Sequence, residues 1–305
     1  MEVVVLGSAA GGGFPQWNCN AATSAGMREG RMRARARTQV SLAVSADGER
    51  WLLLNASPDF RQQVAQTQCL WPKAAPRHSP VEAVLLTGAE IDQVAGLLSM
   101  RESQPFTLWA TERVHSLLAE NPIFSALNPA YVGRRSFALS TPFEITGANG
   151  TMNLMATAYA VPGKVPLFLE GRHAENLAGG PEDTIGVEIS GGGGSFHYIP
   201  GCARMTQALR QRLRDAALVF FDGTLWSDDE LIKLEISSKT GQRMGHMSIS
   251  GEGGTIAAFA NLGVRRKILV HINTTNPILD EDSKERRILA SHGWEVGEDG
   301  MRISL

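Results

Sequence analysis

Two stretches of the chain pass from strand patterns to an alternation of helices and strands. In the first stretch, short apolar runs bounded by Gly, Ser, Asp or Asn are typical of strands and lie at Glu2–Leu6, Gln39–Ser45 and Trp51–Leu54. Apolar residues at helical spacing follow at Pro58–Gln66, Ile91–Met100 and Thr111–Ala119. Strand patterns between these helices lie at Ala83–Thr87 and Phe106–Ala110.

The second stretch repeats this order. Strand patterns come first, at Asn153–Ala160, Thr184–Ser190 and Ser195–Ile199. Helices and strands then alternate at Ala203–Arg214, Ala217–Asp222, Gly254–Leu262, Lys267–Ile272 and Ser283–His292, and a terminal strand follows.

Two such blocks predict an α/β fold with two sheets packed face to face and helices outside, a four-layer αββα sandwich. No fixed-period repeat or long low-complexity linker divides the chain, so residues 1–305 are predicted to form a single domain. A single doubly wound parallel sheet is the alternative, but the strand-only stretch at the start of each half disfavours it.

Composition narrows the range of partners. Hydrophobic residues make up 43% and charged residues 20%, which is typical of a soluble globular protein with a substantial core. The net charge of −2 gives no electrostatic case for binding nucleic acid or an anionic membrane. No apolar run approaches the roughly 18 residues of a membrane span. The basic segment Arg28–Arg37 fits a solvated loop, with a phosphate-binding arm as the alternative.

The cysteines Cys19, Cys69 and Cys202 are few and far apart, so we expect no disulfide framework and a reducing compartment. The first residues, MEVVVLGSAAGG, lack the cationic start and long apolar core of a signal peptide. We therefore expect a cytoplasmic protein.

Candidate metal ligands lie in and beyond the segment Leu85–Leu97, which joins a buried strand pattern to the start of a helix. Glu90 and Asp92 in this segment are close enough to share a cation. His271 ends another strand pattern, and catalytic groups of α/β folds gather at the carboxyl ends of strands. Together they form a mixed nitrogen and oxygen set that suits Fe(II) or Mn(II) better than a thiolate-rich zinc site does. The alternative for His271 is a hydrogen-bonded loop residue.

Candidate acid–base residues are Asp222 and His246. Asp222 ends the strand pattern Ala217–Asp222, so its carboxylate should emerge where His271 emerges. His246 lies between glycine and polar residues in a loop, and His titrates near neutrality, which suits general acid–base catalysis. The alternative for Asp222 is the start of an ordinary turn. The two residues form a functional pair only if both face one pocket.

The glycine-rich segment Gly7–Gly13 follows the first strand pattern but matches neither common nucleotide-binding loop. Phe14-Pro15-Gln16-Trp17 comes next, in place of a helix start. We expect a tight irregular loop near a pocket.

Eight blocks, in order, resemble the coenzyme PQQ biosynthesis protein B family of the metallo-β-lactamase superfamily. The first four are VLGSAAGGGFPQWNCN (5–20), SPDFRQQ (57–63), LLTGAEIDQVAGLLSMRE (85–102) and VPGKVPLFLEG (161–171). The other four are YIPGCA (198–203), FFDGTLWSDDE (220–230), TGQRMGHMSISG (240–251) and VHINTTNP (270–277). The resemblance covers nearly the whole chain and implies the metallo-β-lactamase-like fold.

The resemblance also shows which superfamily ligands this chain lacks. Superfamily hydrolases carry Thr-His-x-His-x-Asp-His between strand and helix, enough for two zinc ions, and the four ligand positions here are Gly88, Glu90, Asp92 and Gln93. A third histidine is replaced near Lys164, and the bridging aspartate by Cys202. The final histidine is matched by His271, so Asp92 and His271 are the best metal candidates, with Glu90 or Gln93 as additional ligands. We expect Gly88 to leave room for substrate or oxygen.

A structural zinc is not expected. Many family members carry a Cys-Asn-Cys-x-x-Cys cluster, of which only Cys19 remains, because Ala21 and Ser24 occupy the other two positions.

The resemblance implies work on the path from a Glu–Tyr cross-linked precursor to pyrroloquinoline quinone (PQQ). The leading hypothesis is an Fe(II)-dependent oxygenase, an oxidoreductase that hydroxylates the tyrosine-derived ring. Asp222 and His246 would handle protons, and Asn273, Asn276 and Arg243 would bind substrate. The alternatives are a non-enzymatic carrier for transport of PQQ or its precursor, and a residual hydrolase. Other proteins of the pathway and a second copy of the chain are further candidate partners.

Overall fold

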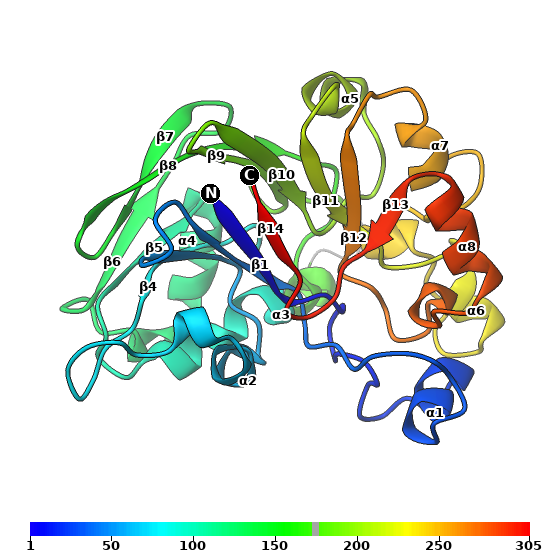
Figure 1. Cartoon of the computed structure of the whole chain (residues 1–305), viewed down its shortest axis with the longest axis horizontal. Coiled ribbons are helices and arrows are strands. Elements are labelled where there is room, and N and C mark those ends of the chain that lie inside the picture. Colours follow the sequence, from blue (N-terminus) through cyan, green and yellow to red (C-terminus); the bar gives the residue numbers. More distant parts are fainter. Residues whose placement is uncertain (173–176) are drawn as a thin grey trace.

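The computed structural model describes residues 1–172 and 177–305 and contains two seven-stranded sheets packed face to face (Figure 1). Helices α2, α3 and α4 lie outside the first sheet, and α5, α7 and α8 lie outside the second. This arrangement confirms the predicted αββα sandwich over the doubly wound alternative.

The first sheet has the strand order β14-β1-β2-β3-β4-β5-β6. Its strands are β1 (Glu2–Gly7), β2 (Ser41–Ser45), β3 (Trp51–Leu54), β4 (Val81–Leu85), β5 (Phe106–Ala110), β6 (Val132–Ser136) and β14 (Arg302–Ser304). Strands β3 to β6 are parallel to one another, whereas β14, β1, β2 and β3 pair antiparallel.

The second sheet has the order β13-β12-β11-β10-β9-β8-β7. Its strands are β7 (Pro142–Gly147), β8 (Gly150–Ala160), β9 (Ile185–Gly191), β10 (Gly194–Ile199), β11 (Leu218–Asp222), β12 (Arg266–Val270) and β13 (Trp294–Val296). Strands β10 to β13 are parallel, and β7 to β10 form antiparallel pairs. Each sheet thus has a parallel part whose carboxyl ends can supply a site.

The helices are short and join these strands. The α-helices are α1 (Ala22–Arg28), α2 (Phe60–Gln66), α3 (Ile91–Val94), α4 (Glu112–Glu120), α5 (Gln207–Leu213), α6 (Glu230–Lys233), α7 (Thr255–Phe259) and α8 (Lys284–Ser291). The 3₁₀ turns are η1 (Gln68–Leu70), η2 (Ala95–Met100), η3 (Pro122–Ala126), η4 (Leu167–Arg172), η5 (Gln242–Met244) and η6 (Pro277–Leu279). No helix among the described residues is both long enough and apolar enough to cross a membrane.

Alternating apolar residues of both sheets meet in one central core. Val3, Leu42 and Leu54 of the first sheet belong to the same buried cluster as Val187 and Phe220 of the second. Separate clusters fill the spaces between each sheet and its outer helices. The parallel strands β3, β5 and β11 are buried along their whole length and have mostly apolar sequences, which made them recognisable as strands from the sequence.

The basic segment Arg28–Arg37 is mostly a solvent-exposed loop, as expected, and it also carries ion pairs to the C-terminal part of the chain. Arg33 pairs with Glu281, and Arg35 pairs with Glu281 and Glu298. The Arg37 side chain is fully buried. These arginines therefore tie the region after α1 to the C-terminal part of the chain.

Candidate functional site

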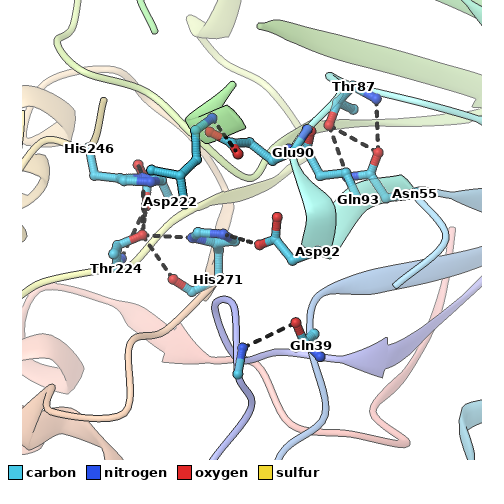
Figure 2. Close-up of polar contacts among 12 residues, drawn as sticks. Gln39, Asn55, Thr87, Glu90, Asp92, Gln93, Asp222, Thr224, His246 and His271 are labelled. Atoms are coloured by element: carbon cyan, nitrogen blue, oxygen red, sulfur yellow. Dashed lines mark hydrogen bonds and ion pairs between the residues drawn. The ribbon is translucent and has the colours of Figure 1, made fainter. Parts of the chain in front are cut away.

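A cavity of about 410 Å³ opens where the ends of strands from both sheets converge. Its wall includes the loop after β1, the β4–α3 turn and the ends of β11 and β12, together with the segments that follow β8 and β10 and the loop that carries His246. Ala10, Gly11 and Gly12 line it, as expected for a glycine loop near a pocket. Strand ends therefore bring together polar groups that are far apart in the sequence (Figure 2).

Asp222 ends β11 and is fully buried. Its Oδ2 accepts hydrogen bonds from Cys202 N (2.9 Å) and His246 Nδ1 (2.7 Å), and its Oδ1 accepts from Thr224 N (3.1 Å) and Thr224 Oγ1 (2.6 Å). Burial alone would raise the pKa of Asp222, but the charge and hydrogen bond of His246 lower it below its ordinary value. Both carboxylate oxygens are thus saturated, and Asp222 orients its neighbours.

His246 follows Gly245, which has a φ of +89°, in the left-handed region that glycine adopts freely. Because His246 Nδ1 donates to Asp222, its Nε2 is the nitrogen left free, and His246 lines the cavity. Asp222 and His246 therefore share one site, as the functional interpretation of the pair requires, and their geometry suits proton transfer at Nε2.

Thr224 lies at the centre of this group. Besides donating to Asp222, its Oγ1 lies 2.8 Å from His271 Nδ1 and 3.1 Å from His246 Nδ1. Because its one proton goes to the carboxylate, Thr224 Oγ1 accepts from His271 Nδ1–H. The remaining nitrogen of His271, Nε2, then points to Asp92. Sequence reasoning missed Thr224, although its place two residues after Asp222 was a usable signal.

His271 and Asp92 face each other from opposite halves of the fold. His271 Nε2 lies 2.9 Å from Asp92 Oδ2 (Figure 2). His271 has a φ of +56°, an unfavourable backbone conformation for this residue that is common at functional sites. Burial alone would lower the pKa of His271, but the hydrogen bond and charge of Asp92 raise it. Burial alone would raise the pKa of Asp92, but the hydrogen bond and charge of His271 help to lower it below its ordinary value.

The residues present fit a divalent metal at this pair. Two ligand atoms that are each about 2 Å from one ion lie roughly 3 Å apart, which matches the separation of His271 Nε2 and Asp92 Oδ2. Asp222, His246 and His271 also each have one potential metal-ligand atom, and these three atoms lie within 4.8 Å of one another. Since Asp222 already accepts four hydrogen bonds, we favour His271 and Asp92 as the primary ligands.

Glu90 and Gln93 line the cavity but are not brought to this pair. Glu90 Oε1 accepts from Lys164 Nζ at 2.6 Å, and its Oε2 accepts from Leu167 N at 3.1 Å. Glu90 and Gln93 also form the capping box of α3, in which Gln93 Oε1 accepts from Glu90 N at 3.3 Å. Both side chains are therefore engaged away from the metal pair.

Gly88 does not leave room for substrate or oxygen, contrary to the sequence-based expectation. A Cβ atom at this residue would lie 2.5 Å from Gln93 Oε1 and 3.0 Å from Asp183 O. The space is thus already filled by Gln93 and by the backbone before β9.

The three predicted substrate-binding residues differ in their placement. Asn273 lines the cavity, and its Nδ2 donates to Thr275 Oγ1 at 2.7 Å. Thr275 in turn donates to the buried Glu230 at 2.5 Å, so the free atom of the Asn273 amide is its acceptor, Oδ1. Sequence reasoning missed this support by Glu230 and Thr275.

Asn276 is not at the cavity wall. It is fully buried, its Nδ2 donates to Gly223 O and Thr224 O, and its Oδ1 accepts from Ile278 N. Its amide therefore holds the backbone that carries Thr224. Arg243 is 39% exposed and lies 3.6 Å from Glu170 Oε2, beside the cavity.

Two further polar residues near the site are structural. Cys202 is buried, and burial, with the charge of Asp222, raises the pKa of its thiol to about 12, so it is unreactive. His197 lies within β10, and its Nδ1 is 3.0 Å from Tyr159 Oη.

Comparison with known proteins agrees with this fold. Residues 50–272 match the family model described as a β-lactamase superfamily domain. The chain is 60% identical to coenzyme PQQ synthesis protein B of Xanthomonas euvesicatoria pv. vesicatoria, over all of both chains. It is 53% identical to the protein of the same name from Gluconacetobacter diazotrophicus, over all of this chain and 99% of the relative.

Solved structures agree as well. Zn²⁺-bound PqqB from Methylobacterium extorquens is 47% identical, covers both chains fully and superimposes with a TM-score of 0.95. A diphosphatase of the PhnP family, 18% identical over 100% of this chain and 97% of its own, has a TM-score of 0.68 and shares the fold. With 60% and 53% identity to these relatives over the full length of this chain, and with the matching family model, this chain belongs to the coenzyme PQQ synthesis protein B family of the β-lactamase superfamily.

Proposed function

We propose that this protein acts in PQQ biosynthesis as an Fe(II)-dependent oxygenase that hydroxylates the tyrosine-derived ring of a Glu–Tyr cross-linked precursor. The pathway is supported by the names of its full-length relatives. The reaction is supported by one observation above all: among the described residues, His271 and Asp92 present a pair of protein ligand atoms, 2.9 Å apart, at a cavity. A site with so few ligands keeps positions open for O₂ and substrate.

The overall step inserts one oxygen atom of O₂ into a ring C–H bond and releases the other as water. Two electrons and two protons are required, and we assign the electrons to a small-molecule reductant. A bound iron ion would supply the activation of O₂, held by His271 Nε2 and Asp92 Oδ2.

The chain's own residues supply orientation and proton handling. Asp222 holds His246 through Nδ1, so His246 Nε2 can accept or return a proton at the substrate. Asn273 Oδ1 accepts a hydrogen bond from an N–H or O–H group of the substrate. The apolar part of the wall, which includes Ile91, Leu167 and Leu231, excludes water from the ring.

The test is anaerobic loading of metal-free protein with Fe(II) or Zn(II), followed by addition of a tyrosine-like substrate, reductant and ¹⁸O₂. We expect a product that carries one labelled oxygen with Fe(II) and none with Zn(II). Asp92→Ala and His271→Ala should lower both bound metal and turnover, whereas Glu120→Gln at an exposed position should change neither.

Two outcomes would contradict the oxygenase. If both site variants keep full metal content and turnover, the site assignment is wrong. If PQQ binds tightly without any metal and no product forms, the carrier is the better description. Action in the cytoplasm, a single domain over residues 1–305, and association with other pathway proteins or a second copy remain part of this proposal.

A further inference from the structure

Three cations surround one carboxylate at the cavity, in a cluster formed by Lys164, Glu170, Lys239 and Arg243. Glu170 Oε2 lies 2.8 Å from Lys239 Nζ and 3.6 Å from Arg243 Nη2, and Glu170 Oε1 lies 3.3 Å from Lys164 Nζ. Lys164, Glu170 and Lys239 line the same cavity as His246 and His271.

Lys164 is the structural member of this cluster. Its side chain is only 14% exposed, its Nζ donates to Glu90 Oε1 and Val165 O, and it lies at ion-pair distance, 3.3 Å, from Glu170 Oε1. It already compensates charge on two carboxylates, so it has no capacity left for a ligand.

Lys239 and Arg243 differ from Lys164 because they keep unused donors. Their side chains are 35% and 39% exposed. Lys239 Nζ has one hydrogen bond, to Glu170, and Arg243 approaches Glu170 only at ion-pair distance among the described residues. Among the described residues, the three cations of this cluster contact two carboxylates, Glu90 and Glu170, so the cluster itself has one more positive than negative charge.

Three other described acids at the site each lie beside a basic group. Asp92 pairs with His271, Asp222 pairs with His246, and Asp183 pairs with Arg113 at 3.2 Å. None of these acids is therefore a free counter-ion for Lys239 and Arg243.

We propose that Lys239 and Arg243, held in place by Glu170, form a subsite that binds a carboxylate of an aromatic amino-acid-like substrate. This inference rests on the proposed function and specifies how its substrate is held. The positive charges of Lys239 and Arg243 favour a carboxylate, because an ammonium and a guanidinium both bind anionic oxygen. The neighbouring apolar wall, with Leu167, Leu231 and Met244, suits the aromatic body.

The test measures binding by calorimetry to metal-free protein without O₂, so it does not depend on turnover. The probes are L-tyrosine, tyramine, which lacks the carboxylate, and inorganic phosphate. The variant Lys239→Gln/Arg243→Gln removes both cations. The matched control, Lys233→Gln/Arg61→Gln, removes the same charge from exposed surface positions.

We expect wild type and the control to bind L-tyrosine more tightly than tyramine. The double variant should bind L-tyrosine about tenfold more weakly or worse, while its affinity for tyramine is unchanged. Equal wild-type affinity for L-tyrosine and tyramine overturns the subsite, and this comparison needs no variant. An equal loss of affinity for L-tyrosine and for tyramine in the double variant also overturns the proposed subsite.

Inorganic phosphate distinguishes the source of the anion. If phosphate binds the wild type as tightly as L-tyrosine does and is lost in the double variant, the subsite is a phosphate site and the carboxylate assignment fails. If carboxylate-dependent binding holds but no labelled oxygen is incorporated in the turnover experiment, the subsite stands and the proposed hydroxylation fails.

Discussion

Thr224 Oγ1 has one proton to donate, and that proton determines how two imidazoles are used. Donation to Asp222 makes Thr224 an acceptor for His271 Nδ1–H, so His271 presents Nε2 to Asp92. Partners that fix the tautomer of a ligating histidine contribute strongly to metal affinity. Thr224 is therefore a positioning residue for the proposed metal pair.

We predict that Thr224→Val weakens binding of Zn²⁺ or Fe²⁺ by about 10- to 100-fold, because His271 loses the acceptor for Nδ1–H. Thr224→Ser keeps the hydroxyl and should retain most of the affinity. Metal titration by calorimetry on metal-free protein gives both values. Equal affinities of the valine and serine variants would show that the hydroxyl has no orienting role.

Sequence reasoning located some site residues and misplaced others for an identifiable reason. Asp222 and His271 follow strands whose carboxyl ends must converge, so their proximity was predictable. The engagement of Glu90 was not, because it depends on Lys164, which is 74 residues away. The Gln93 side chain takes part in the capping box of α3, and this local hydrogen bonding competes with metal binding by Gln93.

At the scale of elements, the loop that carries His246 depends on one glycine. Gly245 has a φ of +89°, and a Cβ atom there would lie 3.3 Å from Lys164 Cγ. Gly201, on the other side of His246, has no such backbone requirement, and its Cβ would lie 3.6 Å from His246 Cε1, an ordinary contact.

Gly245→Ala is therefore expected to lower the free energy of unfolding by about 1–2 kcal/mol. Gly201→Ala should change it by less than about 0.5 kcal/mol. Urea unfolding midpoints measure both. Identical midpoints would mean that the loop relaxes without cost.

Elements with strong apolar patterns were predicted within a few residues, and weak ones were missed. Trp51–Leu54 and Phe106–Ala110 form strands with the bounds that the sequence indicated. Strand β6 was not predicted, because only its first residue is buried and its remaining four are exposed. It forms because the edge of β5 offers backbone partners, which no local pattern reveals.

At the scale of the whole molecule, the contact between Asp92 and His271 links the two halves of the sandwich. Asp92 follows β4 of the first sheet, and His271 follows β12 of the second, 179 residues later. In the metal-free protein this buried ion pair therefore stabilises the packing of one half against the other.

The stability of metal-free protein should depend on pH through this pair. The lowered pKa of Asp92 gives stability that is lost as pH falls through its folded value. The raised pKa of His271 gives stability that is complete below its unfolded value and is lost as pH rises through its folded value. Both contributions are present between about pH 4 and 6.5.

We therefore expect the advantage of wild type over His271→Gln, measured by urea unfolding, to be largest in that window and to shrink at higher pH. Saturating Zn²⁺ should reduce the loss of wild-type stability at higher pH, because the metal ion then replaces the proton between Asp92 and His271. A difference between the proteins that is constant from about pH 6 to 9 would contradict this role.

The close contact between Gly88 and Gln93 couples these two positions. A side chain at residue 88 would place its Cβ 2.5 Å from Gln93 Oε1, so the Gln93 side chain would have to move. Moving it breaks the hydrogen bond from Glu90 N and with it the capping box of α3. A histidine introduced at residue 88 therefore also disturbs the start of the helix that carries Asp92, so the ligand loop and the helix cap cannot be altered separately.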